Sequence, residues 1–520
     1  MSDANVTELP GPRTAGRLTS LLNATLLCAG AVVLLSYAAV ALGHLRDRYQ
    51  VNFVSGVYAG LAARLNEGTL YPDLYDGRHY GGTRYMPMQF VLYAGLARLT
   101  GEYLVSGKLL TYVLTALLCV ELFLILRRIG CGRGIALALT SLVLLTEPGF
   151  LAATTIRGDL LPVVCQLAAV LVAAGHLSLR RAALAGLFCA LAILSKQSAV
   201  WAPLAIFCYH LRERRAVALF VLTWLGTAGA ALVLVNDLSQ GRMLVNLTQL
   251  SVSGGGDLYY LLSPFILLWR IARGGALLAA LVPLLAVECV AARKQRRLTL
   301  HHYCLFACLL VVLLVYTDKE ANMNHLLDLV VTAVPVVGCL WIALPEAGRG
   351  TGGLRLGLGV AVAWLVYMGW ATTLVMPVYE VTRIVRGGRV PPDYAVKPLA
   401  GLVADDAPIL CEDPWVALSR GQTPLVLDPY SLGRMSLHQP HLTGDLRRRI
   451  EARDFRQIVL CQRLDDTNPY DRRAWEDRHF GRPLVRAMRD NYRLHVRAEG
   501  YFVYVPKEDG GPSGAQRAGR

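Results

Sequence analysis

The sequence predicts an α-helical polytopic membrane protein with a small C-terminal α/β domain. Of its 520 residues, 54% are hydrophobic and only 17% are charged, which is not the composition of a soluble chain. Apolar runs of about 18 residues or more recur, and each is long enough to cross a bilayer. Residues 391–506 hold most of the later charge and contain no run of that length.

The chain begins with a polar segment, residues 1–17, that we expect to be a cytoplasmic tail. Arg13 and Arg17 precede the first apolar run, and positive residues beside a span favour the cytoplasmic side. That run, residues 18–43, is too long for the core of a signal peptide, so we expect an uncleaved transmembrane helix. The polar stretch that follows, residues 44–90, is then a large first outer loop.

The later apolar runs alternate across the bilayer when every short arginine cluster is placed inside. This rule predicts spans at residues 109–126, 135–151, 160–179, 183–194, 199–211, 216–235, 274–292, 303–316, 326–344 and 357–376. With the first helix they make about eleven spans within residues 18–376. Residues 91–99 are expected to lie at the interface or to form a half-length helix. Residues 258–269 are placed as an interfacial helix, because a span there would bring the basic cluster at 293–297 outside.

The formal net charge of +15 is expected for a membrane protein of this kind. Cytoplasmic loops of such proteins are rich in Arg and Lys, so the charge by itself does not indicate nucleic acid. No soluble stretch interleaves basic residues with exposed aromatic residues. We therefore expect the lipid bilayer, and not nucleic acid, as a partner.

The composition changes near residue 377, and residues 377–506 are predicted to form the α/β domain. Short buried strands are expected at 408–411, 424–427, 457–460 and 501–505, with helices at 444–454 and 482–490. Cys411 and Cys461 each end a strand-like run. They are expected to be two free thiols or, in an oxidising compartment, a disulfide. An odd number of spans places this domain outside the cell. Residues 507–520 are expected to be a disordered Gly-rich tail.

Polar motifs between the spans all fall on the outer side in this arrangement. They are the first outer loop and residues 154–159, 195–198 and 318–325. Ionisable groups beside a membrane are costly, so their convergence on one side indicates a site.

The order of these parts resembles the GT-C-type membrane glycosyltransferases, a superfamily that includes aminoarabinose transferases and protein O-mannosyltransferases. The common parts are a long acidic first outer loop, a second acidic motif, a Lys near a helix end and a soluble domain after the last span. Residues 61–72 and 80–87 are also similar to segments of that family.

This resemblance implies transfer of a sugar from a polyprenyl-phosphate donor to a glycan, lipid or protein acceptor on the extracytoplasmic face of a cell membrane. Two alternatives stay open, namely a transporter or flippase for a lipid-linked saccharide and a catalytically silent protein of the same fold.

Two aspartates are the candidates for the catalytic carboxylates. In the family an outer-loop Asp is the base or orients the acceptor, but the usual position reads Gln50 to Phe53 here. Either Asp47, the nearest acid, acts from a shifted position, or Asn52 replaces the acid and the base lies elsewhere, or the chain has lost activity. The competing interpretation pairs Asp47 with a neighbouring arginine. Asp159 follows Arg157 and Gly158 and matches the family's second acidic motif, and it is also placed to cap a helix.

Three cations are candidates for binding the donor phosphate: Arg84, Arg157 and Lys196. A lipid phosphate must be met by cations at the bilayer surface, and an acceptor hydroxyl needs a carboxylate nearby. The competing interpretations are that Arg84 anchors the chain at the interface beside Tyr85 and that Lys196 snorkels toward water.

Residues 318–325 are the densest polar cluster at any helix junction. Asn322, Asn324 and His325, together with Tyr85, are candidates for binding the sugar. Asp318, His325 and Asp328 are ligand types that suit a divalent ion, but their spacing is not a strong metal signature. We therefore predict hydrogen bonding first, with no metal or other cofactor indicated.

Overall fold

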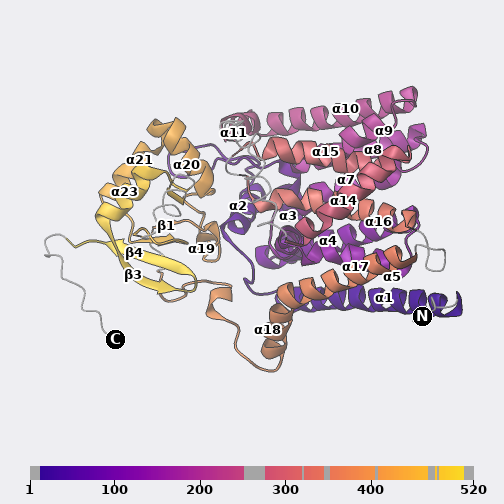
Figure 1. Cartoon of the computed structure of the whole chain (residues 1–520). Helices are drawn as coiled ribbons and strands as arrows, with labels where there is room; N and C mark the ends of the chain where they lie inside the picture. The colour runs from indigo at the N-terminus through magenta and orange to yellow at the C-terminus, as the bar shows by residue number, and fades with distance from the viewer. Residues whose placement is uncertain are drawn as a thin grey trace.

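The computed structural model describes residues 12–250, 276–318, 321–344, 352–403, 408–465, 475–476 and 479–508. Most of these residues are helical, and the helices form one bundle with a small sheet at one end (Figure 1). The N-terminal end of α1 lies at the opposite end of the bundle. The run at residues 258–269 lies outside the described residues.

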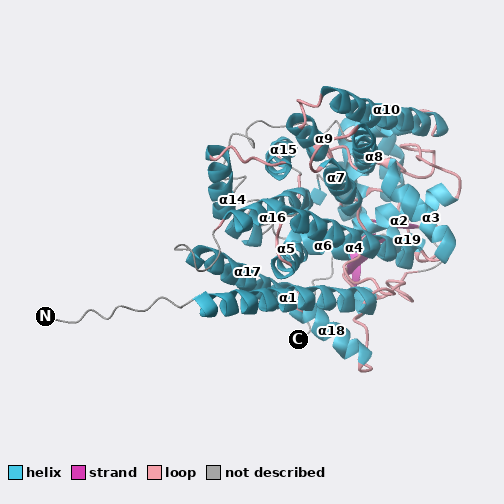
Figure 2. Cartoon of the chain, turned by 90° about the vertical axis from the view of Figure 1, so that its right-hand side faces the viewer, coloured by secondary structure: helices cyan, strands magenta, loops and turns pink. Residues whose placement is uncertain are grey.

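Five helices among the described residues are long and apolar enough to cross a membrane. They are α1 (Pro12–Gly43), α4 (Tyr103–Ile129), α10 (Arg214–Leu238), α16 (Leu326–Ala343) and α17 (Gly352–Thr373). α1 and α17 run side by side, and α10 lies on the other side of the bundle (Figures 1 and 2). These apolar helices indicate a multi-pass membrane protein.

A further candidate span is broken in the middle. The segment expected to span at residues 135–151 is bent, because α5 (Arg133–Leu145) and α6 (Glu147–Thr154) meet at an angle of 78°. The break lies at Thr146, whose hydroxyl accepts a hydrogen bond from the backbone N–H of Gly149 and so caps α6.

Most of the other helices of the bundle differ in length from the expected spans. These other helices are α7 (Leu160–Ala173), α8 (Leu179–Ser195), α9 (Trp201–Tyr209), α14 (Ala276–Lys294) and α15 (Leu300–Val315). The nine residues of α9 rise only about 14 Å at 1.5 Å each, against a hydrocarbon core of about 30 Å. The outer loop expected after residue 235 is also partly helical, because α10 continues to Leu238 and α11 (Arg242–Leu250) follows.

One helix lies within the first outer loop and a second begins at its end, and both lie at the sheet end of the bundle. α2 (Phe53–Asn66) begins with a capping box in which Asn52 and Ser55 exchange hydrogen bonds, so Asn52 has a local structural role. α3 (Pro87–Thr100) begins at Pro87 as expected, since the first helical turn needs no proline N–H.

The sheet has four strands in the order β1-β2-β4-β3. β1 (Ile409–Cys411) is parallel to β2 (Gln457–Leu460), and β4 (Tyr501–Pro506) is antiparallel to both β2 and β3 (Tyr492–Ala498). α20 (Pro429–His438), α21 (Pro440–Glu451) and α23 (Arg482–Asn491) lie beside it (Figure 1). The sheet and these helices, together with α19 (Pro414–Leu418), are called the C-terminal unit below.

The strand expected at residues 424–427 is wrong, because this segment does not join the sheet. Its backbone pairs instead with the first outer loop, where the Tyr80 N–H donates to Leu425 at 2.8 Å and the Leu427 N–H donates to Tyr80 at 2.9 Å. α18 (Val375–Val385) connects α17 to the C-terminal unit. Cys411 and Cys461 are free thiols.

Close contact between α1 and α5 depends on glycine. A Cβ atom added at Gly134 would lie 2.2 Å from the carbonyl oxygen of Asn23, and one added at Gly30 would lie 2.9 Å from the backbone of Leu137. Because the obstacle is backbone in both cases, a larger residue must push the two helices apart.

We predict that Gly134→Ala lowers the stability of the protein by about 1–3 kcal/mol, because overpacking separates α1 from α5. The measurement is thermal unfolding of the full chain in detergent. Gly226→Ala in α10 is the matched control, since a Cβ there meets no atom within 4 Å. That control should be neutral or stabilising, and equal melting temperatures for Gly134→Ala and the wild type would contradict this packing.

Candidate active site

The carboxylate of Asp159 is the meeting point of segments that are far apart in the sequence. Lys196 Nζ donates to Asp159 Oδ1 at 2.8 Å, and Asn324 Nδ2 donates to the same oxygen at 2.9 Å. Arg157 Nε lies 3.2 Å from Asp159 Oδ2. Asp159 is itself only 6% exposed. These four side chains are called the Asp159 cluster below.

Each member of the Asp159 cluster lies where a helix begins or ends. Asp159 directly precedes α7, and Lys196 directly follows α8. Asn324 lies in the short 3-10 helix η2 (Met323–His325), which leads into α16. The helix cap expected at Asp159 is wrong, because its side chain makes no capping hydrogen bond. Its carboxylate binds Lys196 and Asn324 instead.

The charge state of Asp159 follows from these neighbours. Burial alone would raise the pKa of its carboxyl group, but the nearby charges of Lys196 and Arg157 and the hydrogen bonds hold that pKa below the ordinary value. Asp159 is therefore ionised throughout the physiological pH range. A carboxylate held by two cations accepts a proton poorly, so this arrangement suits positioning better than base catalysis.

The first outer loop packs against the same motif through tyrosines. The hydroxyl of Tyr58 in α2 lies against Gly158, where an added Cβ would be 2.2 Å from the tyrosine oxygen. The ring of Tyr58 lies 4.6 Å from the ring of Tyr85, centroid to centroid. A larger residue between Arg157 and Asp159 would therefore force the Tyr58 side chain away from the cluster.

Arg84 connects this loop to the C-terminal unit. Its guanidinium carbon lies 3.6 Å from the ring centroid of Tyr430 in α20 and 5.3 Å from that of Tyr85. Arg84 and Tyr85 are half-buried, whereas Asp159 is buried.

The polar residues of the segment before α16 differ in their contacts with the Asp159 cluster. Asn324 binds Asp159, but the Asn322 side chain accepts from the Met323 N–H at 2.7 Å and so has a local role. His325 is half-buried, and its ring has no hydrogen-bond partner among the described residues. Asp328, one turn into α16, accepts from Trp201 Nε1 at 2.7 Å.

Asp47 lies in a separate buried network. It accepts from the Tyr49 N–H at 2.8 Å, its Oδ2 lies 2.7 Å from His44 Nδ1, and its Oδ1 lies 3.6 Å from Lys108 Nζ. The expected pairing with a neighbouring arginine is wrong. Within the described ranges, no hydrogen bond or ion pair joins Asp47 to the Asp159 cluster.

Arg48, which directly follows Asp47, pairs with residues of the C-terminal unit. Arg48 donates to Asp413 of the C-terminal unit at 2.9 Å and also to the hydroxyl of Tyr501 in β4. Asp413 and Asp428 cap α19 and α20 by accepting from the Trp415 N–H and the Tyr430 N–H. The contact of Asp413 with Arg48 adds a connection between the two parts of the chain.

Several residues of these networks were not among the candidates from the sequence. Lys108 had a usable signal, since a lysine at the start of a long apolar helix needs an anionic or polar partner. Tyr58 and Tyr430 had no such signal, because a tyrosine in an outer loop or after a predicted strand is common.

No three His, Cys, Asp or Glu side chains in the described part of the chain are close enough to hold one metal ion.

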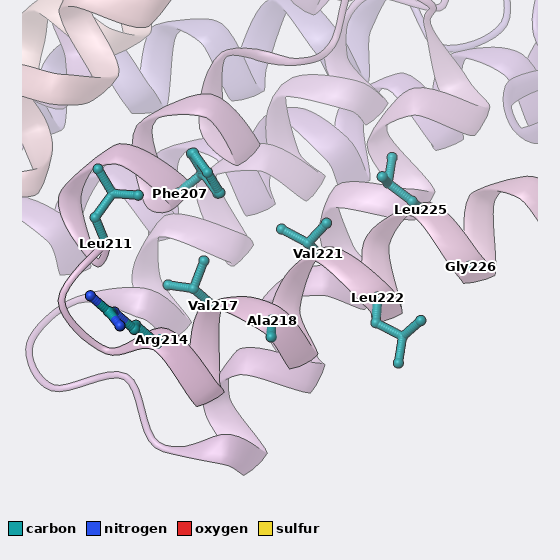
Figure 3. Close-up of a pocket in the computed structure, with 9 residues that line it drawn as sticks. All are labelled: Phe207, Leu211, Arg214, Val217, Ala218, Val221, Leu222, Leu225 and Gly226. Atoms are coloured by element: carbon teal, nitrogen blue, oxygen red, sulfur yellow. The ribbon is translucent and has the colours of Figure 1, made fainter.

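A large open groove of about 660 Å³ lies away from these polar residues, on α9 and α10 (Figure 3). It is lined by Phe207, Leu211, Arg214, Val217, Ala218, Val221, Leu222, Leu225 and Gly226. Leu222 and Leu225 are 70% and 54% exposed, which is typical of a surface that faces lipid. Its single charged residue does not make it a candidate for the chemistry.

The ion pairs of Asp159 predict a specific dependence of stability on pH. Asp159→Asn leaves two cations without their counter-charge and should destabilise the protein by about 3–5 kcal/mol near neutral pH. Because the pKa is lowered in the folded state, this stabilisation is complete above the ordinary pKa of about 4 and decreases as the pH falls below it.

The measurement is thermal unfolding of the wild type and Asp159→Asn between pH 3 and 8. The gap between the two melting temperatures should be constant from pH 5 to 8 and should shrink below about pH 4. A gap that changes between pH 6 and 8 would show that Asp159 titrates there, contrary to this geometry.

Solved structures of other proteins show which known fold this chain has. No protein-family model matches the chain, and no curated protein matches its sequence. Its structure is similar to that of ArnT from Cupriavidus metallidurans bound to undecaprenyl phosphate, with a TM-score of 0.58 and 15% identity over 94% of this chain and 99% of that one.

A second similar structure is the archaeal oligosaccharyltransferase AglB from Archaeoglobus fulgidus, in complex with an inhibitory peptide and a dolichol-phosphate. Its TM-score is 0.50, with 12% identity over 93% of this chain and 75% of that one. An apo form of the Archaeoglobus enzyme gives a TM-score of 0.51. The chain therefore has the fold of the GT-C glycosyltransferases, as the order of its parts predicts.

Proposed function

We propose that the protein is a membrane glycosyltransferase that moves a sugar from a polyprenyl-phosphate-linked donor to an acceptor on the extracytoplasmic face. The observation that carries this proposal is the Asp159 cluster, in which Arg157, Lys196 and Asn324 converge on one buried carboxylate. Two of these residues are cations, and the half-buried Arg84 belongs to the loop that packs against the cluster.

The cations of this region suit a phosphate leaving group. When the sugar leaves its carrier, negative charge develops on the lipid phosphate, and preorganised cations stabilise it. The terminal guanidinium nitrogens of Arg157 have no hydrogen-bond partner among the described residues, so they can bind an anion while Nε stays near Asp159. Lys196 is 18% exposed at its side chain and is held in place by the same carboxylate.

The acceptor side of the reaction needs a carboxylate that can take a proton. We assign this role to Asp47, and we assign to Asp159 the positioning of the cations. Asn324 and His325 supply hydrogen bonds to the sugar, with Tyr85 and Asn322 at the edge of the site. His325 supports this role, because its half-buried ring is unpaired within the described part of the chain.

The Asp159 cluster and the C-terminal unit are assigned to the same side of the membrane. About eleven crossings, several of them by short helices, place the Asp159 cluster and residues 377–506 on the extracytoplasmic side. The sheet and the loop holding Arg84 lie together at one end of the helices (Figure 1), which supports an α/β domain next to the site.

The similar structures support a lipid-linked donor. ArnT was solved with undecaprenyl phosphate, and AglB was solved with dolichol-phosphate and an inhibitory peptide. A polyprenyl phosphate therefore fits as the carrier in this chain, and the acceptor is a glycan, a lipid or a protein.

The direct test is consumption of a lipid-linked sugar by the purified full chain. Asp47→Asn and Asp159→Asn should each lower the rate at least about 100-fold, since one loses the base and the other loses the position of two cations. Glu67→Gln is the control, because Glu67 is an acid of the same loop with a 54% exposed side chain. Unchanged turnover in both Asp variants would refute the proposal.

The phosphate role of Arg157 has its own test. Arg157→Gln should raise the donor KM about ten- to hundredfold, which is the worth of one hydrogen bond to a charged group. Arg98→Gln, at an exposed arginine of α3, should leave the donor KM unchanged. If only the acceptor KM changed, Arg157 would be a ligand of the acceptor and not of the donor phosphate.

A further inference from the structure

The ring of Tyr430 covers one face of the Arg84 guanidinium, although the two residues belong to different parts of the chain. The distance from the guanidinium carbon to the ring centroid is 3.6 Å. Such stacking is stronger where water is excluded, and both side chains are half-buried. Stacking uses the flat face of the guanidinium, so its N–H groups point outward in the plane of the group.

The position of the Tyr430 ring is itself fixed from several directions. Arg434, one turn later in α20, donates to the Tyr430 hydroxyl from Nε at 3.1 Å and from Nη2 at 2.9 Å. Asp428 caps the same helix by accepting from the Tyr430 N–H at 3.0 Å. Arg434 is buried, at 7% exposure. The ring is therefore held at its backbone and at its hydroxyl.

The backbone beside Arg84 is held by the same segment of the C-terminal unit. Tyr80 exchanges two backbone hydrogen bonds with Leu425 and Leu427, which lie just before α20. Residues 425–430 thus fix both the course of the loop before Arg84 and the plane of its guanidinium. A free arginine side chain loses up to about 2 kcal/mol of rotamer entropy when it is immobilised. Here that cost is met on folding, before any ligand binds.

From these contacts we infer that the C-terminal unit completes the donor-phosphate site. Tyr430 is a positioning residue that orients Arg84 toward a polyprenyl monophosphate, and Arg434 holds Tyr430 in that orientation. This inference rests on the proposed function, because it takes Arg84 as a phosphate ligand. It assigns part of the donor site to residues that come after the last membrane helix.

The test measures binding of undecaprenyl phosphate to the full chain in lipid nanodiscs. Tyr430→Leu should weaken binding about tenfold, which is the worth of one desolvated cation–π contact. Tyr430→Phe keeps the ring and should bind within about threefold of the wild type. In turnover, Tyr430→Leu should lower kcat/KM for the donor by a similar factor, because the loss acts through Arg84, which contacts the phosphate both before and while charge develops on it.

A double-mutant cycle with Arg84→Gln separates positioning from a general effect. If Tyr430 acts through Arg84, Tyr430→Leu should weaken binding no further once Arg84 is replaced. Equal effects of Tyr430→Leu in both backgrounds would overturn the inference. If Arg84→Gln alone binds undecaprenyl phosphate as the wild type does, the phosphate role of Arg84 in the proposed function fails instead.

Tyr75→Phe is the matched control for contact between the two parts of the chain. It removes the 3.1 Å hydrogen bond from Tyr75 to Asp445, which also joins the first outer loop to the C-terminal unit but lies away from Arg84. Tyr75→Phe should bind undecaprenyl phosphate as the wild type does, and a tenfold loss of binding would overturn the specific role of Tyr430.

Should Tyr430→Leu fail to fold, Arg434→Gln replaces it in the same double-mutant cycle, with an expected loss of binding of about threefold.

Discussion

The meeting of several helix ends at one place depends on one electrostatic constraint, the buried charge of Asp159. An isolated carboxylate in a protein interior costs several kcal/mol, and cations with hydrogen-bond donors must offset this cost. The chain supplies them from the end of α8 and from the turn before α16. These helix ends must therefore meet at one place, and the polar groups that meet there are those that a charged substrate needs.

Contact between the first outer loop and the C-terminal unit is a second consequence of charge. Arg48 binds Asp413, and Arg84 stacks on Tyr430, so these two arginines of the loop find partners beyond the last membrane helix. The backbone pairing of Tyr80 with residues 425–427 joins the same surfaces. Because these partners are buried or half-buried, the loop and the C-terminal unit behave as one structure around the site.

The sequence predicted the grouping of polar segments better than the geometry of the helices. Placing arginine clusters inside is a local rule, and it correctly put Asp159, Lys196 and Asn324 together. The break at Thr146 and the short α9 were not predicted, because hydropathy does not show where backbone hydrogen bonding stops. The competing interpretation of Asp47 paired it with a neighbouring arginine, whereas the cation beside it is Lys108 on another helix, which no local pattern reveals.

The most direct measurement of the central claim is an experimental structure of the full chain in a bilayer with undecaprenyl phosphate. The account predicts a phosphate bound by Arg84, Arg157 and Lys196, with Asp159 still holding the lysine and with the C-terminal unit on the same side of the membrane. A phosphate bound instead at the groove beside Arg214, or an Asp159 without its cations, would contradict it.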